Sequence, residues 1–171
     1  SKARQILMDA GANVDSEPLW LFQHALMAKA YVQHRWDIDL PSIGLLNVGE
    51  ESAKGDTLRK KTFALMENIE GFIGNCEGRD LTTGNPQIVI TDGFTGNVAL
   101  KTMEATFKSI SKMFMEVLSK PELVEASGQV LPHLFMSAKE MHPDSFGGAV
   151  LLGVNSLVLI SLGHSNGVTI Y

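Results

Sequence analysis

Short apolar segments alternate with longer helical patterns along this chain, which restricts its fold more than any other feature. The apolar segments are residues 5–8, 42–48, 72–73 and 87–91. Such alternation is typical of α/β proteins with a parallel sheet. The unbroken apolar run at 42–48 indicates a strand that is buried on both faces. The sequence therefore predicts a three-layer α/β/α fold with a largely parallel sheet.

The first two helices are well marked. Ser16 and Pro18 are typical of a helix start, and the pattern runs to about His34. Asp56 caps a second helix that extends to about Glu67. The apolar side chains of the first helix form one stripe at three- and four-residue spacing. This stripe consists of Leu19, Phe22, Leu26, Met27, Ala30 and Tyr31.

The second half of the chain is less regular. A loop at 93–97 precedes a long helical pattern at 98–118, and Pro121 ends that helix. Residues 122–141 form a weaker helical pattern, broken by Gly128 and Pro132. Gly147 and Gly148 precede a helix or turn, and residues 156–161 form the last strand. We find no linker, repeat or low-complexity tract, which predicts one compact domain.

Composition excludes several classes of protein. The 171 residues include 19 acidic and 14 basic side chains, whereas a general nucleic-acid binder would carry a basic domain or stripe. Cys76 is the one cysteine, so an internal disulfide framework and a cysteine-cluster zinc site are both excluded. Charged residues make up 19% of the chain, below the usual figure of about 25%, which suggests a surface reserved for a partner.

Four loops rich in Gly, Asn and acidic residues follow the strands, at 9–13, 47–51, 74–80 and 92–97. Ligands of open parallel sheets bind outside the carboxyl ends of the strands, and a helix start beside them attracts anions. Lys54 and Lys101 each follow such a loop and add a full positive charge. Any one loop is also typical of a plain turn. Together the loops predict a site for a small anion or a phosphorylated compound, and the absence of G-x-G-x-x-G and Walker A patterns disfavours nucleotides.

Five segments resemble conserved motifs of the PlsX family, the phosphate acyltransferases of bacterial phospholipid synthesis. They are 9–15 (DAGANVD), 44–51 (GLLNVGEE), 74–80 (GNCEGRD), 91–98 (TDGFTGNV) and 146–153 (FGGAVLLG). The resemblance implies an enzyme that turns acyl carrier protein thioester and inorganic phosphate into acyl phosphate and free carrier protein, without a cofactor. It also implies a fold similar to that of isocitrate and isopropylmalate dehydrogenases.

The resemblance covers the C-terminal half of the family. Together with a strand beginning at residue 5, it leads us to expect that 1–171 is the C-terminal portion of a single α/β acyltransferase domain, cut from a longer protein. A helical hairpin insertion is expected around 101–141. Leu162 stands where the family usually has His. If that His contributes to the active cleft, the chain has either lost its contribution or replaced it with His164.

Acyl transfer to phosphate requires cations and N–H donors for the phosphate, stabilisation of the oxyanion, and alignment of the substrates. Phosphate is itself the nucleophile, so no Ser or Cys nucleophile is needed. The predicted catalytic residues are Lys54, Asp92, Asn97 and Lys101. The predicted substrate-binding residues are Asn13, Asn47, Gly49, Glu50, Gly74, Asn75, Glu77, Arg79, Gly93, Thr95 and Gly96.

Within this set, the cations would hold phosphate or the oxyanion, the asparagines would orient the reacting groups, and Glu77 or Asp92 would position a cation or accept a proton. Plainer interpretations remain open. Arg79 can form a structural ion pair with Asp80, and Lys101 can be a solvated helix residue. Cys76 is expected to have a packing role. The five histidines show no metal-ligand spacing, so no metal site is expected.

The helix at 101–120 is amphipathic, with apolar residues at three- and four-residue spacing. It predicts either a core helix or a projecting hairpin that packs a homodimer or touches the inner face of a membrane. Acyl carrier protein is strongly acidic, so a basic patch should meet it, either residues 59–61 or Lys108 with Lys112 and Lys120. The family resemblance implies a cytoplasmic protein that binds no nucleic acid.

Two other functions stay open from the sequence. One is a related phosphate acyltransferase that uses coenzyme A thioesters. The other is a truncated, non-catalytic module for dimerisation or membrane recruitment.

Overall fold

The computed structural model describes residues 4–139 and 149–160. The chain divides into a first unit, residues 1–100, and a second unit, residues 101–171. Helix α3 (Gly93–Leu118) begins in the first unit and continues into the second.

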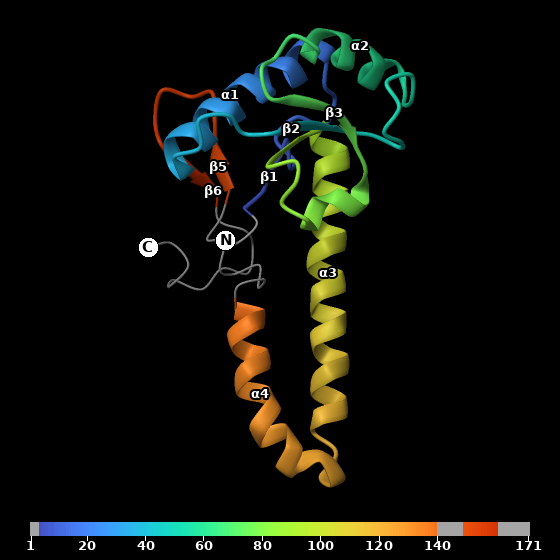
Figure 1. The fold of residues 1–171 in the computed structure, drawn as a ribbon, viewed down its shortest axis with the longest axis vertical. Helices are drawn as coiled ribbons and strands as arrows, with labels where there is room; N and C mark the ends of the chain where they lie inside the picture. The colour runs from blue at the N-terminus through green and yellow to red at the C-terminus, as the bar shows by residue number, and fades with distance from the viewer. Residues whose placement is uncertain (1–3, 140–148, 161–171) are drawn as a thin grey trace. The chain divides into compact units, whose positions relative to one another are not determined.

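The first unit is built on a four-stranded sheet (Figure 1). Its strands are β1 (Ile6–Met8), β2 (Ile43–Leu46), β3 (Phe72–Cys76) and β4 (Ile88–Ile90). The order is β1-β4-β2-β3, and all three pairings are parallel. Every residue of β2 and β4 is buried, which confirms the prediction of a strand buried on both faces. Since the strands are parallel, the polar loops that follow them gather at one edge of the sheet.

Two helices pack together on one face of this sheet, α1 (Pro18–Trp36) and α2 (Thr57–Met66) (Figure 1). Their buried side chains join those of the strands in one apolar cluster. That cluster consists of Leu21, Ala25, Ala28, Val32, Ile43, Leu45, Met66, Ile69, Ile88 and Ile90. A smaller cluster of Leu46, Cys76 and Val89 packs with Leu7 and with Leu81 of η1 (Gly78–Thr82). The predicted α/β class with a mostly parallel sheet is confirmed.

The buried face of α1 overlaps only in part with the predicted stripe, of which Phe22 and Tyr31 are partly buried against the core. Leu19 and Leu26 are 54% and 45% exposed, and Ala30 is exposed as well. The helix instead packs on the sheet through Leu21, Ala25, Ala28 and Val32, with His24 beside them. Small alanines allow the helix backbone to lie close to the strands, and periodicity alone does not say which of two apolar faces the sheet will cover.

The second unit holds the rest of α3, then η2 (Pro121–Leu123), α4 (Val124–Lys139) and an antiparallel pair, β5 (Ala149–Leu151) with β6 (Val158–Ile160). The predicted break at Gly128 and Pro132 is wrong, because α4 runs through both. An internal proline removes one helix hydrogen bond, and the remaining bonds of a 16-residue helix hold it together. The predicted helix or turn after Gly148 is the strand β5. Leu162 and His164 lie outside the described residues.

Candidate functional site at the carboxyl edge of the sheet

The loop after β1 is organised by Asp9, which is 5% exposed. Its Oδ1 accepts hydrogen bonds from the backbone N–H of Gly11 at 2.8 Å and of Ala12 at 2.7 Å. Its Oδ2 accepts from the backbone N–H of Asn13 at 2.7 Å and from its Nδ2 at 2.9 Å. Burial acts to raise the pKa of Asp9, but these bonds outweigh burial and lower it. Asp9 is therefore an ionised carboxylate whose hydrogen-bonding capacity is used within its own loop.

Asp9 was not among the predicted site residues, whereas Asn13 was. Asp followed by Gly two positions later is a common turn pattern, in which the carboxylate binds the backbone ahead of it. The predicted ligand-binding amide of Asn13 is thus engaged by Asp9.

Asp92, after β4, caps the start of α3. Its Oδ1 accepts the backbone N–H of Thr95 at 2.8 Å, and its Oδ2 accepts the Thr95 hydroxyl at 2.8 Å. Residues 93–97, predicted as a loop, are the first turn of the helix. The cap is the physical reason, because a carboxylate that satisfies free N–H groups lets a helix begin directly after the strand.

Gly93 and Gly96 bring this helix start against the loop after β1. The Gly93 N–H donates to the Asn13 carbonyl at 2.9 Å, and a Cβ at position 93 would lie 2.5 Å from the same oxygen. At position 96 a Cβ would lie only 1.8 Å from the carbonyl oxygen of Asp9. Both glycines are therefore required by contact with the chain's own backbone. Asn97 faces Gly11, because a Cβ added at position 11 would lie 3.6 Å from the Cβ of Asn97.

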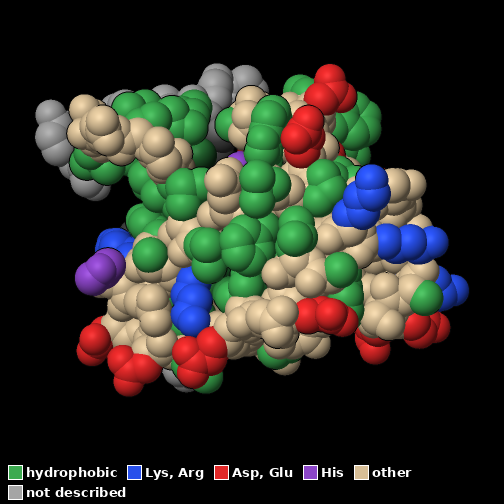
Figure 2. All heavy atoms as spheres, turned by 90° about the horizontal axis from the view of Figure 1, so that it is seen from above, with side chains coloured by type: hydrophobic (Ala, Val, Ile, Leu, Met, Phe, Trp, Pro, Cys, Tyr) green, Lys and Arg blue, Asp and Glu red, His purple; other side chains and the backbone are tan. Residues whose placement is uncertain are grey.

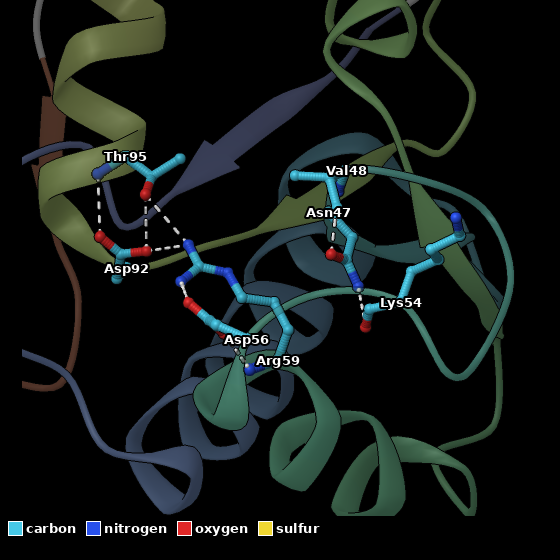
Figure 3. Close-up of polar contacts among 7 residues, drawn as sticks. All are labelled: Asn47, Val48, Lys54, Asp56, Arg59, Asp92 and Thr95. Carbon is cyan, nitrogen blue, oxygen red and sulfur yellow. Dashed lines mark hydrogen bonds and ion pairs between the residues drawn. The ribbon is translucent and has the colours of Figure 1, made fainter.

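Arg59, from the first turn of α2, joins this region (Figure 3). Its guanidinium pairs with Asp92, donates to the Thr95 hydroxyl at 3.0 Å and pairs with Asp56 at 2.9 Å. Only 12% of the Arg59 side chain is exposed. The expected basic patch at residues 59–61 is corrected accordingly, since Arg59 is used internally and only Lys60 and Lys61 are exposed.

Burial acts to raise the pKa of Asp92, but the two bonds from Thr95 and the charge of Arg59 outweigh it and lower that pKa. Asp92 is therefore an ionised carboxylate paired with Arg59, and it is a poor proton acceptor. The spacing of Asp56 and Arg59 signals a local pair on a helix. The contact from Arg59 to Asp92 spans 33 residues, and no local pattern indicates it.

The loop after β2 is closed by Asn47. Its Oδ1 accepts the N–H of Val48 at 2.8 Å, and its Nδ2 donates to the carbonyl of Lys54 at 3.1 Å (Figure 3). Gly55 has a φ of +91°, and a Cβ there would lie 2.3 Å from the Asn47 Oδ1, so the closed loop requires glycine.

Lys54 lies across Gly49, where a Cβ would be 3.2 Å from the lysine Cγ. The lysine is exposed, and among the described residues no ion pair holds its ammonium group. Lys54 thus differs from Arg59, whose charge is already matched by carboxylates.

Asn75 anchors the same loop from β3. Its Nδ2 donates to the Glu51 carbonyl at 2.8 Å, and its buried Oδ1 has no hydrogen-bond partner among the described residues. The predicted strand 72–73 extends to Cys76, so Asn75 and Gly74 lie in β3 rather than in the loop after it. Burial, with the negative charge of Asp80 added, raises the pKa of Cys76 to about 12. Cys76 is therefore a packed thiol and a poor nucleophile.

Charged side chains gather on the surface after β3. Arg79 pairs with Glu50 and with Glu77, each at 2.6 Å, and its side chain is 65% exposed. The hydrogen bond to Glu50 and the charge of Glu77 raise the pKa of Arg79. The expected pair with Asp80 is wrong, because the Asp80 carboxylate instead accepts the N–H of Glu77 at 2.8 Å in a capping box.

Lys101 belongs to the second unit, where its ammonium pairs with Glu104 at 3.0 Å. The other predicted site residues all lie at the strand ends of the first unit, whereas Lys101 is part of the second unit. Within residues 4–139 and 149–160, no group of three or more His, Cys, Asp and Glu side chains is arranged to hold a metal ion. In the same residues no helix is both long and apolar enough to span a bilayer.

Comparison with known proteins identifies relatives that match this chain over nearly its whole length. The family model described as "Fatty acid synthesis protein" matches residues 1–171. A protein of Geobacillus sp. (strain WCH70) named phosphate acyltransferase is 44% identical over 168 residues, which cover 97% of this chain and 51% of that protein. The phosphate acyltransferase of Bacillus pumilus (strain SAFR-032) is 42% identical over 163 residues, 94% of this chain and 49% of that protein.

A third phosphate acyltransferase, from Pseudothermotoga lettingae, is 44% identical over 165 residues. The chain spans about half the length of these curated relatives. The match runs through all four strand-end loops of the first unit. The chain belongs to the PlsX family of fatty acid synthesis proteins.

Proposed function

We propose that this chain forms about half of a phosphate acyltransferase that acts on acyl carrier protein thioesters and inorganic phosphate. A phosphate oxygen attacks the thioester carbonyl carbon, the C–S bond breaks, and the carrier thiol leaves with a proton, giving acyl phosphate. The observation that carries the proposal is the match to proteins of that name over nearly the whole chain. The PlsX family resemblance supports acyl carrier protein as the donor.

Lys54 is the cation best placed to hold phosphate in the first unit. Its charge is unmatched among the described residues, whereas carboxylates hold Arg59 and Arg79. Asn47 and Asn75 fix the loop that carries it. We assign Asn97 and Lys101 to the stabilisation of the reacting carbonyl, and we assign Glu50, Glu77 and Arg79 to contacts with the substrates. Asp92 holds the start of α3.

The test is formation of acyl phosphate from acyl carrier protein thioester and phosphate. It should be measured with the chain alone and with the chain co-expressed with the half of the Geobacillus relative that it does not match. Lys54→Ala should lower phosphate-dependent turnover about 100-fold, a loss typical of removing one charged or oxyanion-binding group. Arg35→Ala removes another exposed cation, in the last turn of α1, and is the control that should retain activity. Equal activity of both variants would remove Lys54 from the site.

Lys101 has a matched control on the same helix. Lys112 pairs with Glu116 at 3.7 Å, much as Lys101 pairs with Glu104. Lys101→Ala should lower kcat, whereas Lys112→Ala should at most raise the KM for the carrier protein. If the two substitutions act alike, Lys101 is a solvated helix residue.

The donor is identified by comparing acyl carrier protein with coenzyme A thioesters. A reaction driven by the acidic carrier should weaken as salt is raised, because exposed charges are screened. Lys60 and Lys61, or Lys108 with Lys112 and Lys120, are the exposed basic groups proposed to meet it. Faster, salt-independent turnover with coenzyme A would favour the related coenzyme A-dependent reaction.

The second unit favours an additional role in dimer or membrane contact. Five apolar residues near the end of α3 are between 43% and 53% exposed: Ile110, Met113, Phe114, Met115 and Val117. Such a helix suits a homodimer interface or the surface of a bilayer, and we propose a cytoplasmic protein that makes one of these contacts through residues 101–141. Liposome flotation and sedimentation of a Leu131→Ser/Leu134→Ser variant test it. If the variant keeps both vesicle binding and dimer formation, this additional role is excluded. The alternative of a module that only recruits partners would be excluded with it.

A further inference from the structure

Helix α2 carries a buried cation, Arg59. Viewed from above, charged side chains stand towards the margins of the face formed by α1 and α2 (Figure 2). Arg59 departs from this distribution, because only 12% of its side chain is exposed. Its guanidinium instead reaches from the first turn of α2 to the start of α3 (Figure 3). Burying a cation costs free energy, so it persists only where several partners hold it at once.

The partners of Arg59 come from two segments of the chain. One terminal nitrogen pairs at 2.9 Å with Asp56, the cap of α2. The other pairs with Asp92 and donates to the Thr95 hydroxyl at 3.0 Å, both at the start of α3. Within residues 4–139 and 149–160, no other hydrogen bond or ion pair joins residues 47–66 to residues 92–97. Arg59 is therefore the polar link between these two segments.

The two segments carry different parts of the candidate site. Lys54, the proposed phosphate cation, lies two residues before Asp56, and its carbonyl accepts the Asn47 amide at 3.1 Å. Asn97, proposed to stabilise the reacting carbonyl, lies two residues after Thr95 in α3. The segments leave from β2 and β4, which are neighbours in the sheet. A phosphate held by one segment attacks a carbonyl held by the other efficiently only if the separation of the two is fixed.

We propose that Arg59 is a positioning residue for acyl transfer, which holds the loop after β2 and the start of α3 at the separation that the reaction needs. The inference rests on the proposed function, and it assigns Arg59 no contact with either substrate. A guanidinium suits this role, because its planar fork of donors can satisfy several oxygen atoms at once, whereas a lysine ammonium is a single point charge.

The test separates turnover from substrate binding. Arg59→Met removes the charge that joins the two segments and leaves Lys54 in its loop. We therefore expect kcat for acyl phosphate formation to fall at least about tenfold, with the KM for phosphate within about twofold of the wild type. The measurement uses the chain co-expressed with the unmatched half of the Geobacillus relative. It is made at a temperature where tryptophan fluorescence shows the chain to be folded, since both tryptophans lie in α1.

Arg59→Lys is a milder variant for the case in which Arg59→Met does not fold. It keeps a positive charge but not the planar fork, so its kcat should also fall at an unchanged KM for phosphate.

Lys29→Met is the matched control. Lys29 is also largely buried, with 17% of its side chain exposed, and it joins α1 to the turn before β3. Its ammonium donates to the Glu70 carbonyl at 2.8 Å and pairs with the Glu70 carboxylate at 3.6 Å. Loss of these contacts should lower the urea midpoint and leave kcat unchanged.

Amide hydrogen exchange of residues 93–97 provides a measurement that needs no turnover. The N–H of Thr95 is held by Asp92 at 2.8 Å, and Arg59 in turn holds Asp92. Exchange in this turn should quicken at least about tenfold in Arg59→Met and stay unchanged in Lys29→Met.

Four results would overturn the inference. They are wild-type kcat in a folded Arg59 variant, an equal loss of kcat in Lys29→Met, a raised KM for phosphate at unchanged kcat, and unchanged exchange at residues 93–97. The second would make the loss a general effect of stability, and the third would place Arg59 in direct contact with phosphate. If the wild-type complex forms no acyl phosphate, the proposed function fails. Faster exchange in Arg59→Met would then keep the link between the two segments, and unchanged exchange would remove it.

Discussion

The two pairs of strand ends in the first unit carry similar residues but use them differently. After β1 and β4, the carboxylates of Asp9 and Asp92 are buried and accept hydrogen bonds from neighbouring backbone and side-chain groups. After β2 and β3, the charges of Lys54, Glu50 and Arg79 are exposed. Groups already satisfied within the protein stabilise a fold, whereas exposed charges on a fixed loop remain able to bind a ligand.

The comparison separates support from recognition within one sheet edge. The β1–β4 side holds the start of α3 in place through close backbone contact at Gly96 and the charge pair of Arg59 with Asp92. The β2–β3 side presents a loop that is closed by Asn47 and anchored by Asn75. Substitutions at Asp9, Asp92 and Gly96 should therefore affect folding, and those in the loops after β2 and β3 should affect binding.

The largest effect is expected at Gly96. A methyl group there would meet the Asp9 carbonyl oxygen at 1.8 Å and the Asp9 carbonyl carbon at 2.9 Å, and these backbone atoms cannot swing away as a side chain could. Gly96→Ala should destabilise the first unit by more than about 4 kcal/mol or prevent its folding. Urea unfolding followed by tryptophan fluorescence measures this directly.

Gly78→Ala provides the control, since no atom lies within 4 Å of a Cβ at that position. Its free energy of unfolding should stay within about 0.5 kcal/mol of the wild type. Equal midpoints for the two variants would show that α3 does not depend on close contact with the loop after β1.

The next effect is expected at Asp92. Asp92→Ala leaves the Arg59 guanidinium, only 12% exposed, without one of its two carboxylates. Breaking a buried ion pair from one side typically costs about 3–5 kcal/mol, and the remaining pair with Asp56 should keep the loss near the lower value.

A double-mutant cycle with Arg59→Met checks the cause. If the charge pair is responsible, Arg59→Met should recover part of the stability lost in Asp92→Ala. Additive losses would mean that Asp92 acts only as the helix cap of α3.

Several of these features could be predicted from the sequence. Alternation of strand and helix gave the parallel sheet, and parallel strands bring their following loops to one edge. The sequence patterns did not predict that Asn47 closes the loop after β2, or that residues 93–97 form the first turn of α3. Both features depend on particular side-chain hydrogen bonds, those of Asn47 within its loop and the cap that Asp92 makes on α3. Arg59 was assigned to a surface patch, since its partner Asp92 is 33 residues away.

The choice of the buried face of α1 shows the same limit. Helical periodicity finds apolar stripes, and α1 has two of them. The choice between them was made by the small side chains of Ala25 and Ala28, which fit closely against the strands. Pattern alone carries no measure of that fit.

A smaller effect should follow acidification, through His24. Burial lowers the pKa of His24 below its ordinary value of 6.5, and the nearby charge of Asp9 raises it only in part. The folded state thus favours neutral His24, so the unfolded chain binds more protons and stability is lost as the pH falls below about 6.5. The lowered pKa values of Asp9 and Asp92 act in the same direction, but below about 4.

His24→Phe should therefore flatten the dependence of unfolding free energy on pH between about 7 and 5. His34→Gln, at an exposed position of the same helix, should keep the wild-type slope. An unchanged slope in His24→Phe would place the acid sensitivity elsewhere in the chain.

The smallest effect is expected on the β2–β3 side. Glu50→Gln removes the exposed one of the two partners of Arg79, and exposed pairs contribute little to stability because water and salt screen them. Its urea midpoint should match that of the wild type both at low salt and in 1 M salt. A loss as large as that of Asp92→Ala would show that the β2–β3 charges also support the fold, and the division between the two sides of the sheet edge would fail.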